Sequence, residues 1–97
     1  MQVKFLSGAK NYVGISSVNV NPGDLESIFN QIANIINKNI SIVLDKKNNK
    51  SYLIYENNNK KIKSTIIILY KNKNILEFDN LDFFNEDIVI TMPMAGG

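Results

Sequence analysis

The chain of 97 residues has no cysteine and no histidine, which excludes disulfides, thiolate nucleophiles, zinc sites of the usual kind and imidazole-based triads. Its net charge is only +2, and all of its basic residues are lysine; without arginine, the bidentate reader of phosphate and guanine, no nucleic-acid partner is expected. No apolar run reaches membrane-spanning length and the first residues show no signal-peptide pattern, so we expect a cytoplasmic protein with no membrane partner.

The first half of the chain predicts two strands and an amphipathic helix. Side chains alternate in character over Gln2–Ser7 and again over Ile15–Val20, with a turn or short helical turn at 8–14 between them, which favours two antiparallel strands. Asn21 is the predicted N-cap of the following helix and Pro22 its first residue. Apolar residues then recur every three or four positions, as in a helix that covers one sheet: Leu25, Ile28, Phe29, Ile32, Ile35 and Ile36.

The second half is rich in predicted strands. Ser41–Leu44 and Tyr52–Tyr55 flank a polar break, which indicates a hairpin. Thr65–Tyr70 is apolar on both alternating sets of positions, as expected of a central strand. After a turn, Ile75–Phe78 predicts a short strand, and beyond a polar loop Ile88–Met92 predicts the last one.

This order of elements, β-β-α-β-β, predicts an α+β fold of the β-grasp (ubiquitin-like) type. A mixed sheet would pack on one main helix, with an extended hairpin in the middle of the chain. The helical crossover allows the first and last strands to pair in parallel. A chain of this length can bury one modest core, so we expect a single domain over residues 1–97, with 93–97 as a flexible carboxyl-terminal tail.

One helix can cover only one face of a sheet. The other face, with Phe5 or Leu6 and part of Ile66–Tyr70, is therefore expected to dock a partner. The competing expectation, given equal weight, is that the hairpin of Ile40–Tyr55 covers this face and builds a second core beneath it.

The residues outside the tail offer little chemistry. Four acidic residues, Asp79, Asp82, Glu86 and Asp87, gather before the last strand. They could form an acid–base pair or a cation site, but they lack the ligand spacing, central glycine and final glutamate of a calcium loop, so a solvated turn is favoured. Serine, threonine and tyrosine have no histidine to activate them, so we expect neither an enzyme by itself nor a bound metal or cofactor.

The sequence ends in Met92-Pro93-Met94-Ala95-Gly96-Gly97. Proline biases the residue before it towards extended backbone, so this segment is predicted to project from the domain. A final glycine has no Cβ beside its carboxylate, and two successive glycines can enter a narrow cleft. The segment therefore suits a carboxylate that another protein activates, and an ordinary frayed terminus is the alternative.

The stretches VKFLSGAKNYVGIS and FFNEDIVITMPMAGG together resemble the MoaD-type small subunit of molybdopterin synthase, in the ubiquitin-like sulfur-carrier family (MoaD/ThiS). Members of that family open with a strand and a turn that has glycine at the Gly14 position, and they close with a strand, a proline and a small-Gly-Gly end. Asn85 replaces a glycine of the acidic turn before the last strand, which a left-handed turn tolerates. The chain departs from the family at 70–74, where Val-Asn-Gly is common, and in its longer stretch over 40–63.

The resemblance implies that the chain carries sulfur. An E1-like enzyme would adenylate the Gly97 carboxylate with ATP, and a persulfide donor would convert it to a thiocarboxylate. The tail, comprising Pro93, Met94, Ala95 and Gly96, would thread into the large subunit of molybdopterin synthase for molybdenum cofactor biosynthesis. The alternatives are a ThiS-type carrier for the thiazole of thiamin, a ubiquitin-like modifier joined to lysines through Gly97, and a β-grasp interaction domain whose tail is never activated.

Overall fold

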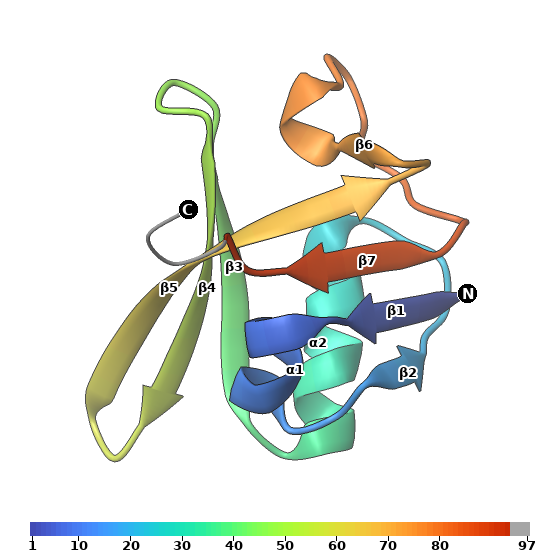
Figure 1. The fold of residues 1–97 in the computed structure, drawn as a ribbon. Helices are drawn as coiled ribbons and strands as arrows, with labels where there is room; N and C mark the ends of the chain where they lie inside the picture. The colour runs from blue at the N-terminus through green and yellow to red at the C-terminus, as the bar shows by residue number, and fades with distance from the viewer. Residues whose placement is uncertain (94–97) are drawn as a thin grey trace.

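A computed structural model describes residues 1–93, which form an α+β fold with a mixed seven-stranded sheet and two α-helices (Figure 1). This confirms the predicted class. The elements in chain order are β1 (Gln2–Phe5), α1 (Ser7–Val13), β2 (Ser17–Asn19), α2 (Leu25–Ile36), β3 (Asn39–Asp45), β4 (Lys50–Asn57), β5 (Lys60–Tyr70), β6 (Lys73–Asn74), the short 3₁₀ helix η1 (Ile75–Glu77) and β7 (Ile88–Thr91).

The strands lie in the order β2-β1-β7-β5-β4-β3, with β6 paired to β5 beside this path. The first and last strands are parallel neighbours, with Val3 opposite Ile88 and Phe5 opposite Ile90. The helix α2 is the crossover that makes this pairing possible. β1 and β2 are antiparallel. The structure therefore confirms the antiparallel pairing predicted for the first two strands and the parallel pairing predicted for the first and last strands.

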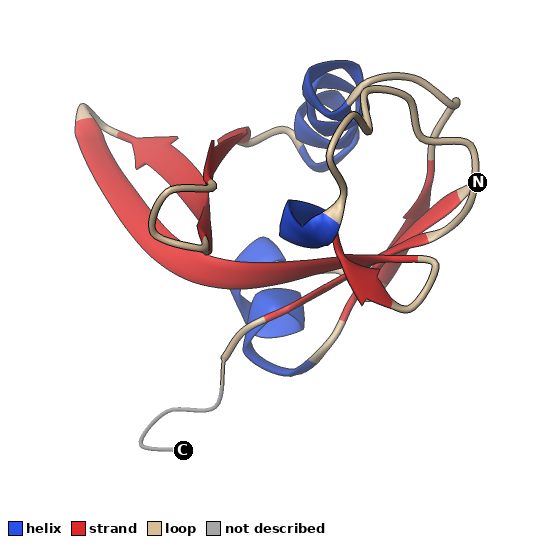
Figure 2. Ribbon diagram, turned by 90° about the horizontal axis from the view of Figure 1, so that it is seen from above, coloured by secondary structure: helices blue, strands red, loops and turns tan. Residues whose placement is uncertain are grey.

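The long strand β5 joins two parts of the sheet. Its first residues, Lys60–Ile66, pair with β4, whereas Ile67–Tyr70 pair with β7. Figure 2 shows the resulting curvature of β5, which carries the β3–β4 hairpin away from the rest of the sheet. The predicted hairpin is therefore confirmed, with strands longer than the sequence pattern indicated.

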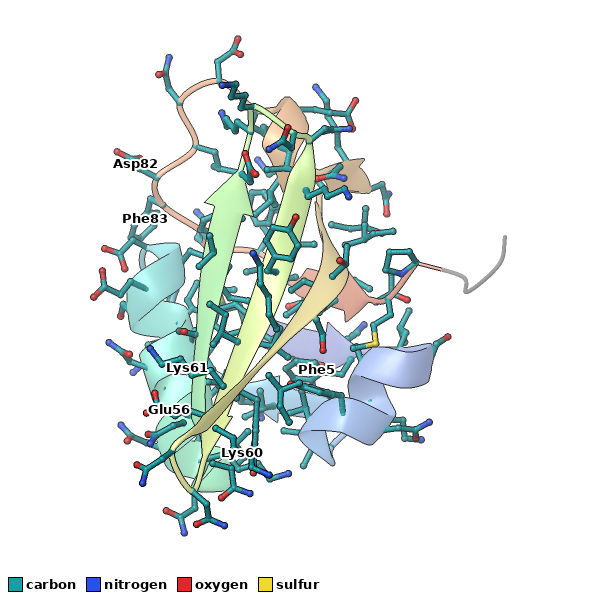
Figure 3. All side chains as sticks on the ribbon, turned by 90° about the vertical axis from the view of Figure 1, so that its left-hand side faces the viewer. Phe5, Glu56, Lys60, Lys61, Asp82 and Phe83 are labelled. Carbon is teal, nitrogen blue, oxygen red and sulfur yellow. The ribbon has the colours of Figure 1, made fainter. Side chains whose placement is uncertain are left out.

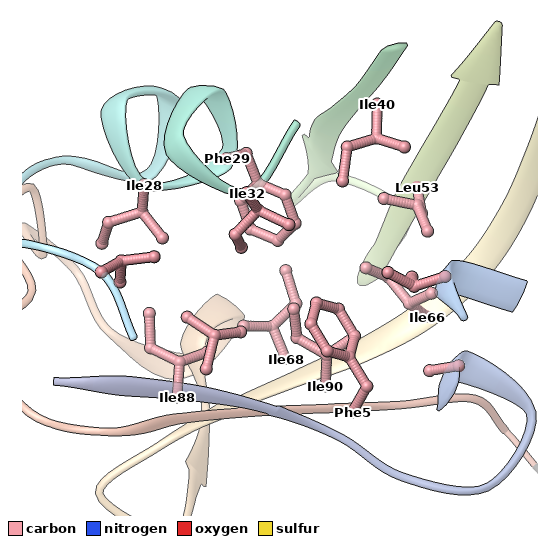
Figure 4. Packing of buried hydrophobic residues seen from close by; sticks show 14 of the residues in the cluster. Phe5, Ile28, Phe29, Ile32, Ile40, Leu53, Ile66, Ile68, Ile88 and Ile90 are labelled. Atoms are coloured by element: carbon pink, nitrogen blue, oxygen red, sulfur yellow. The ribbon is translucent and has the colours of Figure 1, made fainter. Parts of the chain in front are cut away.

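The core lies between α2 and the concave side of this curved sheet (Figures 2 and 4). Helix α1 closes the core near the ends of β1 and β7, where Ala9 and Val13 are buried. The hairpin contributes Ile40 and Leu53 to the same cluster as the rest of the sheet, so the residues that the structure describes form one core and no second core beneath the hairpin. The largest fully buried apolar side chains of this core are Phe5, Ile28, Ile32, Leu53, Ile66, Ile68, Ile88 and Ile90.

The predicted start of α2 is wrong by three residues. The N-cap is Asp24, whose Oδ1 accepts a hydrogen bond of 2.7 Å from the Ser27 N–H. Asn21 is held outside the helix, because its backbone N–H and C=O both bond to the side-chain amide of Gln31. Gly23 forms an antiparallel bridge with Phe84, so the residues before Asp24 pair with the loop preceding β7 and cannot begin the helix.

Two further predictions are corrected. Ile75–Phe78 does not form a strand, because the Asn74 side chain accepts a 3.0 Å hydrogen bond from the Leu76 N–H and begins the 3₁₀ turn of η1. Ile35, predicted on the apolar face of α2, is 56% exposed, whereas its neighbour Ile36 packs against the core.

Candidate functional site

The strand β7 leads to the predicted tail and is held on both sides. It pairs in parallel with β1 and antiparallel with β5, and its inward side chains Ile88 and Ile90 are completely buried. The backbone hydrogen bonding between β1 and β7 continues one residue past the end of β1, because the Leu6 N–H donates a 2.9 Å hydrogen bond to the Ile90 carbonyl. The chain therefore approaches residue 93 from a rigid part of the sheet.

A contact with α1 fixes the point at which the chain leaves the domain. Met92 is half-buried and packs against the core. A Cβ atom built on Gly8 would lie only 2.9 Å from the Met92 Sδ atom, so the absence of a side chain at position 8 makes room for the thioether. Pro93, the next residue, is exposed.

Four of the five predicted site residues lie outside the part of the chain that the structure describes: Met94, Ala95, Gly96 and Gly97. Pro93 is described, and its exposure places the base of the predicted tail on the surface. The geometry thus gives the position and surroundings of this base, comprising Met92 and Pro93.

The sheet face turned away from α2 carries an apolar strip made of Ile67, Leu69 and Val89, called the outer strip below. All three side chains are half-buried. Val89 lies opposite both Leu69 on β5 and Lys4 on β1, and Ile67 lies opposite Thr91, next to the base of the tail.

Of the residues expected on this face, Ile67 and Leu69 lie on it, whereas Phe5 does not. Phe5, Ile66, Ile68 and Tyr70 point into the core and are buried, whereas Leu6 is 48% exposed. Val89 was not predicted as part of the surface. Its position follows from alternation, because its neighbours Ile88 and Ile90 both face inward.

A shallow hollow extends from the outer strip towards the start of β7, and Lys4, Leu69 and Val89 contribute to its lining. Its rim includes Lys71 and Glu86, whose Nζ and Oε2 atoms form an ion pair at 3.2 Å. This mixture of half-buried apolar groups and exposed charges is suited to contact with another protein and supplies no nucleophile paired with a base.

The acidic residues before β7 have separate structural contacts. Asp87 accepts a 2.8 Å hydrogen bond from the Gln2 N–H, and Glu86 pairs with Lys71. Asp79 and Asp82 border a different hollow next to η1 and the start of α2. Asn85 is not among the residues with positive φ, so the left-handed turn expected there is absent. Within residues 1–93 no cluster of three or more acidic side chains is arranged to hold a metal ion.

Comparison with known proteins finds no matching family model, no matching curated protein and no matching solved structure. None of the helices in residues 1–93 is both long enough and apolar enough to cross a membrane. The features that bear on function are therefore the sheet topology, the base of the tail, the outer strip and the sequence after Pro93.

Proposed function

We propose that this chain is a sulfur carrier with a β-grasp fold, the small subunit of a molybdopterin synthase, and that the Gly97 carboxylate is its reacting group. The observation that carries the proposal is the position of β7. This strand lies between β1 and β5 in the sheet, and the residues that follow it are Met92, the exposed Pro93 and then Met-Ala-Gly-Gly. A firmly held strand that leads directly into a slender segment is the arrangement needed to present a reactive end.

In the proposed reaction an E1-like enzyme adenylates the Gly97 carboxylate with ATP and releases pyrophosphate. The terminal sulfur of a persulfide donor then displaces AMP to give an acyl disulfide. A second thiol cleaves the S–S bond of this intermediate, which releases the thiocarboxylate and leaves that thiol in a disulfide with the donor sulfur. In the large subunit of molybdopterin synthase, the thiocarboxylate sulfur attacks the cyclic pyranopterin precursor. The chain itself binds no cofactor. Its folded domain holds the tail in place, and the length of the tail allows the terminal carboxylate to enter the partner. Four residues beyond Pro93 can extend at most about 14 Å, enough to place the last carbonyl carbon inside a partner's cleft.

The outer strip supports the same proposal, because it lies beside the base of the tail. Ile67 pairs with Thr91, two residues before Pro93. A partner that covers Ile67, Leu69 and Val89 would bury half-exposed apolar surface and would at the same time lie next to the point where the tail leaves the sheet. Docking and capture of the tail could then use one continuous interface.

A ThiS-type carrier would use the same chemistry with a different acceptor, so co-purification with a pterin-synthase large subunit distinguishes it from the proposed role. A ubiquitin-like modifier would leave Gly97 attached to lysines of target proteins, which mass spectrometry detects. An interaction domain with an inert tail would show neither adenylation nor conjugation.

The decisive experiment compares the chain with three variants: Gly97 deleted, one alanine added after Gly97, and Gly97→Ala. Each is incubated with candidate E1-like enzymes, ATP and a sulfur donor, and adenylate or thiocarboxylate is read by intact mass. Deletion withdraws the carbonyl carbon by about 3.5 Å, and a misplacement of about 1 Å can cost about a hundredfold in rate. Deletion should therefore abolish the reaction, and extension should abolish it by converting the carboxylate into an amide.

Gly97→Ala should slow the reaction without preventing it, because its methyl group narrows the fit in the cleft. Melting curves of all variants serve as the control and should coincide with that of the unaltered chain. Full activity of the truncated chain would refute both the sulfur-carrier and the modifier functions and leave an interaction domain.

A further inference from the structure

The strand β3 is a free edge of the sheet. All of its residues, Asn39–Asp45, pair with β4 on one side, and it ends the strand order. In residues 1–93 no backbone hydrogen bond connects its other side to a further element. The strand at the opposite end, β2, has only three residues, so β3 offers the longer row of unpaired backbone groups.

This edge lacks the usual protection against pairing with another chain. In natural proteins, edge strands are prevented from pairing with other chains by lysine or proline residues, by β-bulges or by being very short. β3 has seven residues with the sequence NISIVLD, and none of the eleven lysines of the chain lies within it. Val43 and Leu44 are 42% and 40% exposed, so the edge also presents apolar side chains to solvent.

A groove runs between this edge and α2, and Figure 3 shows the helix lying alongside β3. Its apolar lining comes from Leu25 and Phe29 on the helix and from Ile40, Ile42 and Leu44 on the strand. An added strand could place its own alternate side chains over this groove while its backbone bonds to β3.

The sequence of β3 is complementary to itself about Ile42. In an antiparallel pair of two copies centred there, Ile42 meets Ile42, Ile40 meets Leu44, and Ser41 meets Val43. The three apolar residues of β3 that line the groove, Ile40, Ile42 and Leu44, thus pair with one another, as a twofold axis perpendicular to the sheet requires. At the ends Asp45 meets Asn39. The next positions outward bring Lys38 opposite Lys46, and both of these lysines already donate hydrogen bonds within their own copy, to the carbonyls of Val13 and Phe78.

We propose that β3 pairs with β3 of a second copy, forming a symmetric dimer whose sheet continues across the twofold axis. The pairing satisfies the free backbone groups of both strands and buries Leu44 of each copy beside Ile40 of the other. Two strands, β4 and β5, separate this edge from β7, so the dimer leaves the base of the tail and the outer strip accessible. The proposal does not depend on the sulfur-carrier function.

The test uses two pairs of charged substitutions at exposed positions of β3. Ser41→Lys with Val43→Lys places lysine opposite lysine twice in the proposed register, and Ser41→Glu with Val43→Glu does the same with glutamate. Light scattering coupled to size exclusion should find the unaltered chain at twice its mass of 11.0 kDa. Each charged variant should dimerise at least about tenfold more weakly, because directly opposed like charges destabilise cross-strand pairs.

Mixing the lysine variant with the glutamate variant should restore the dimer, because every opposed pair then carries opposite charges. Ser17→Lys with Thr65→Lys is the matched control, since both residues are exposed and lie outside β3, and it should dimerise like the unaltered chain. Melting curves establish that all variants fold. A monomer at all concentrations, dimerisation of the lysine variant at full strength, or failure of the mixture to associate would each overturn the proposal.

Discussion

The hydroxyl group of Tyr70 and the amide groups of Asn85 form a reciprocal pair of hydrogen bonds. Tyr70 Oη donates to Asn85 Oδ1 at 2.9 Å and accepts from the Asn85 N–H at 3.2 Å. Tyr70 is buried, and its ring meets that of Phe84 edge-on with centroids 4.9 Å apart. The loop that enters β7 is thereby tied to β5 just before the strand begins.

Tyr70→Phe should lower the free energy of unfolding by about 1–2 kcal/mol, because it removes both bonds and leaves the partly buried Asn85 groups without this partner. Urea denaturation measures the loss. Tyr12→Phe is the matched control: its hydroxyl donates one exposed bond of 3.3 Å to the Ile62 carbonyl, and its loss should cost less than about 0.5 kcal/mol. Equal losses in the two variants would contradict a special role for the Tyr70–Asn85 pair.

The two candidate caps of α2 can be separated by substitution. Asp24→Ala should destabilise the protein by about 1 kcal/mol, because it removes the side chain that accepts the Ser27 N–H. Asn21→Ala should change stability by less than about 0.5 kcal/mol, since Gln31 is bonded to the backbone of Asn21 and not to its side chain. Thermal and urea unfolding of the two variants provide the comparison, and the reverse order would restore Asn21 as the cap.

The outer strip can be tested in the proposed activation reaction. Leu69→Lys should weaken capture by the E1-like enzyme by about tenfold, the size of effect expected when a charge enters an apolar contact of an interface. Ile35→Lys is the control, because Ile35 is an exposed isoleucine on α2, away from the strip. Binding is measured by titration and folding by circular dichroism. If the two variants bind the E1-like enzyme equally well, the outer strip takes no part in recognition of this partner.

The Asp45 carboxylate, at the turn between β3 and β4, is expected to make a contribution to stability that depends on pH. Hydrogen bonds from the side chain and backbone of Asn48 lower the pKa of Asp45 below its ordinary value of 3.8, and Lys63 and Lys50 act in the same direction. Because the folded state favours the carboxylate, this stabilisation is present above the ordinary value and is lost as the pH falls through the lowered pKa.

Asp45→Ala should therefore lower the melting temperature at about pH 7 more than at about pH 2. Asn48→Ala should reproduce this pattern, because it removes the side-chain donor to the same carboxylate. A difference between Asp45→Ala and the unaltered chain that stays constant across the pH range would contradict the assignment.

Periodicity in the sequence predicted the elements whose residues contact the core directly. The spacing of Ile28, Phe29 and Ile32 encodes the buried side of α2, and the rule for crossovers predicted that β1 and β7 are parallel. The first half of β5 was missed, because Lys60–Ser64 is polar and becomes a strand only through its pairing with β4.

Other features depend on contacts between residues that are distant in the sequence. The bridge between Gly23 and Phe84 moves the start of α2 to Asp24, and local capping patterns hold no information about it. At the site, the alternation in β7 would have been enough to predict that Val89 points outward, although Val89 was not among the residues predicted for this face. The packing of Met92 against Gly8 brings together the two ends of the described chain, and no pattern within either segment indicates it.

The parallel pairing of β1 and β7 also determines how the domain bears tension. The start of β1 and the end of β7 lie at opposite ends of the paired strands (Figure 1). Force applied between the first residues and Pro93 therefore slides the two strands along each other, and the load is shared by all their hydrogen bonds at once instead of opening them one by one. A partner that draws the chain into a cleft by the segment after Thr91 would pull against this shared resistance, so the domain should remain folded while its end is held.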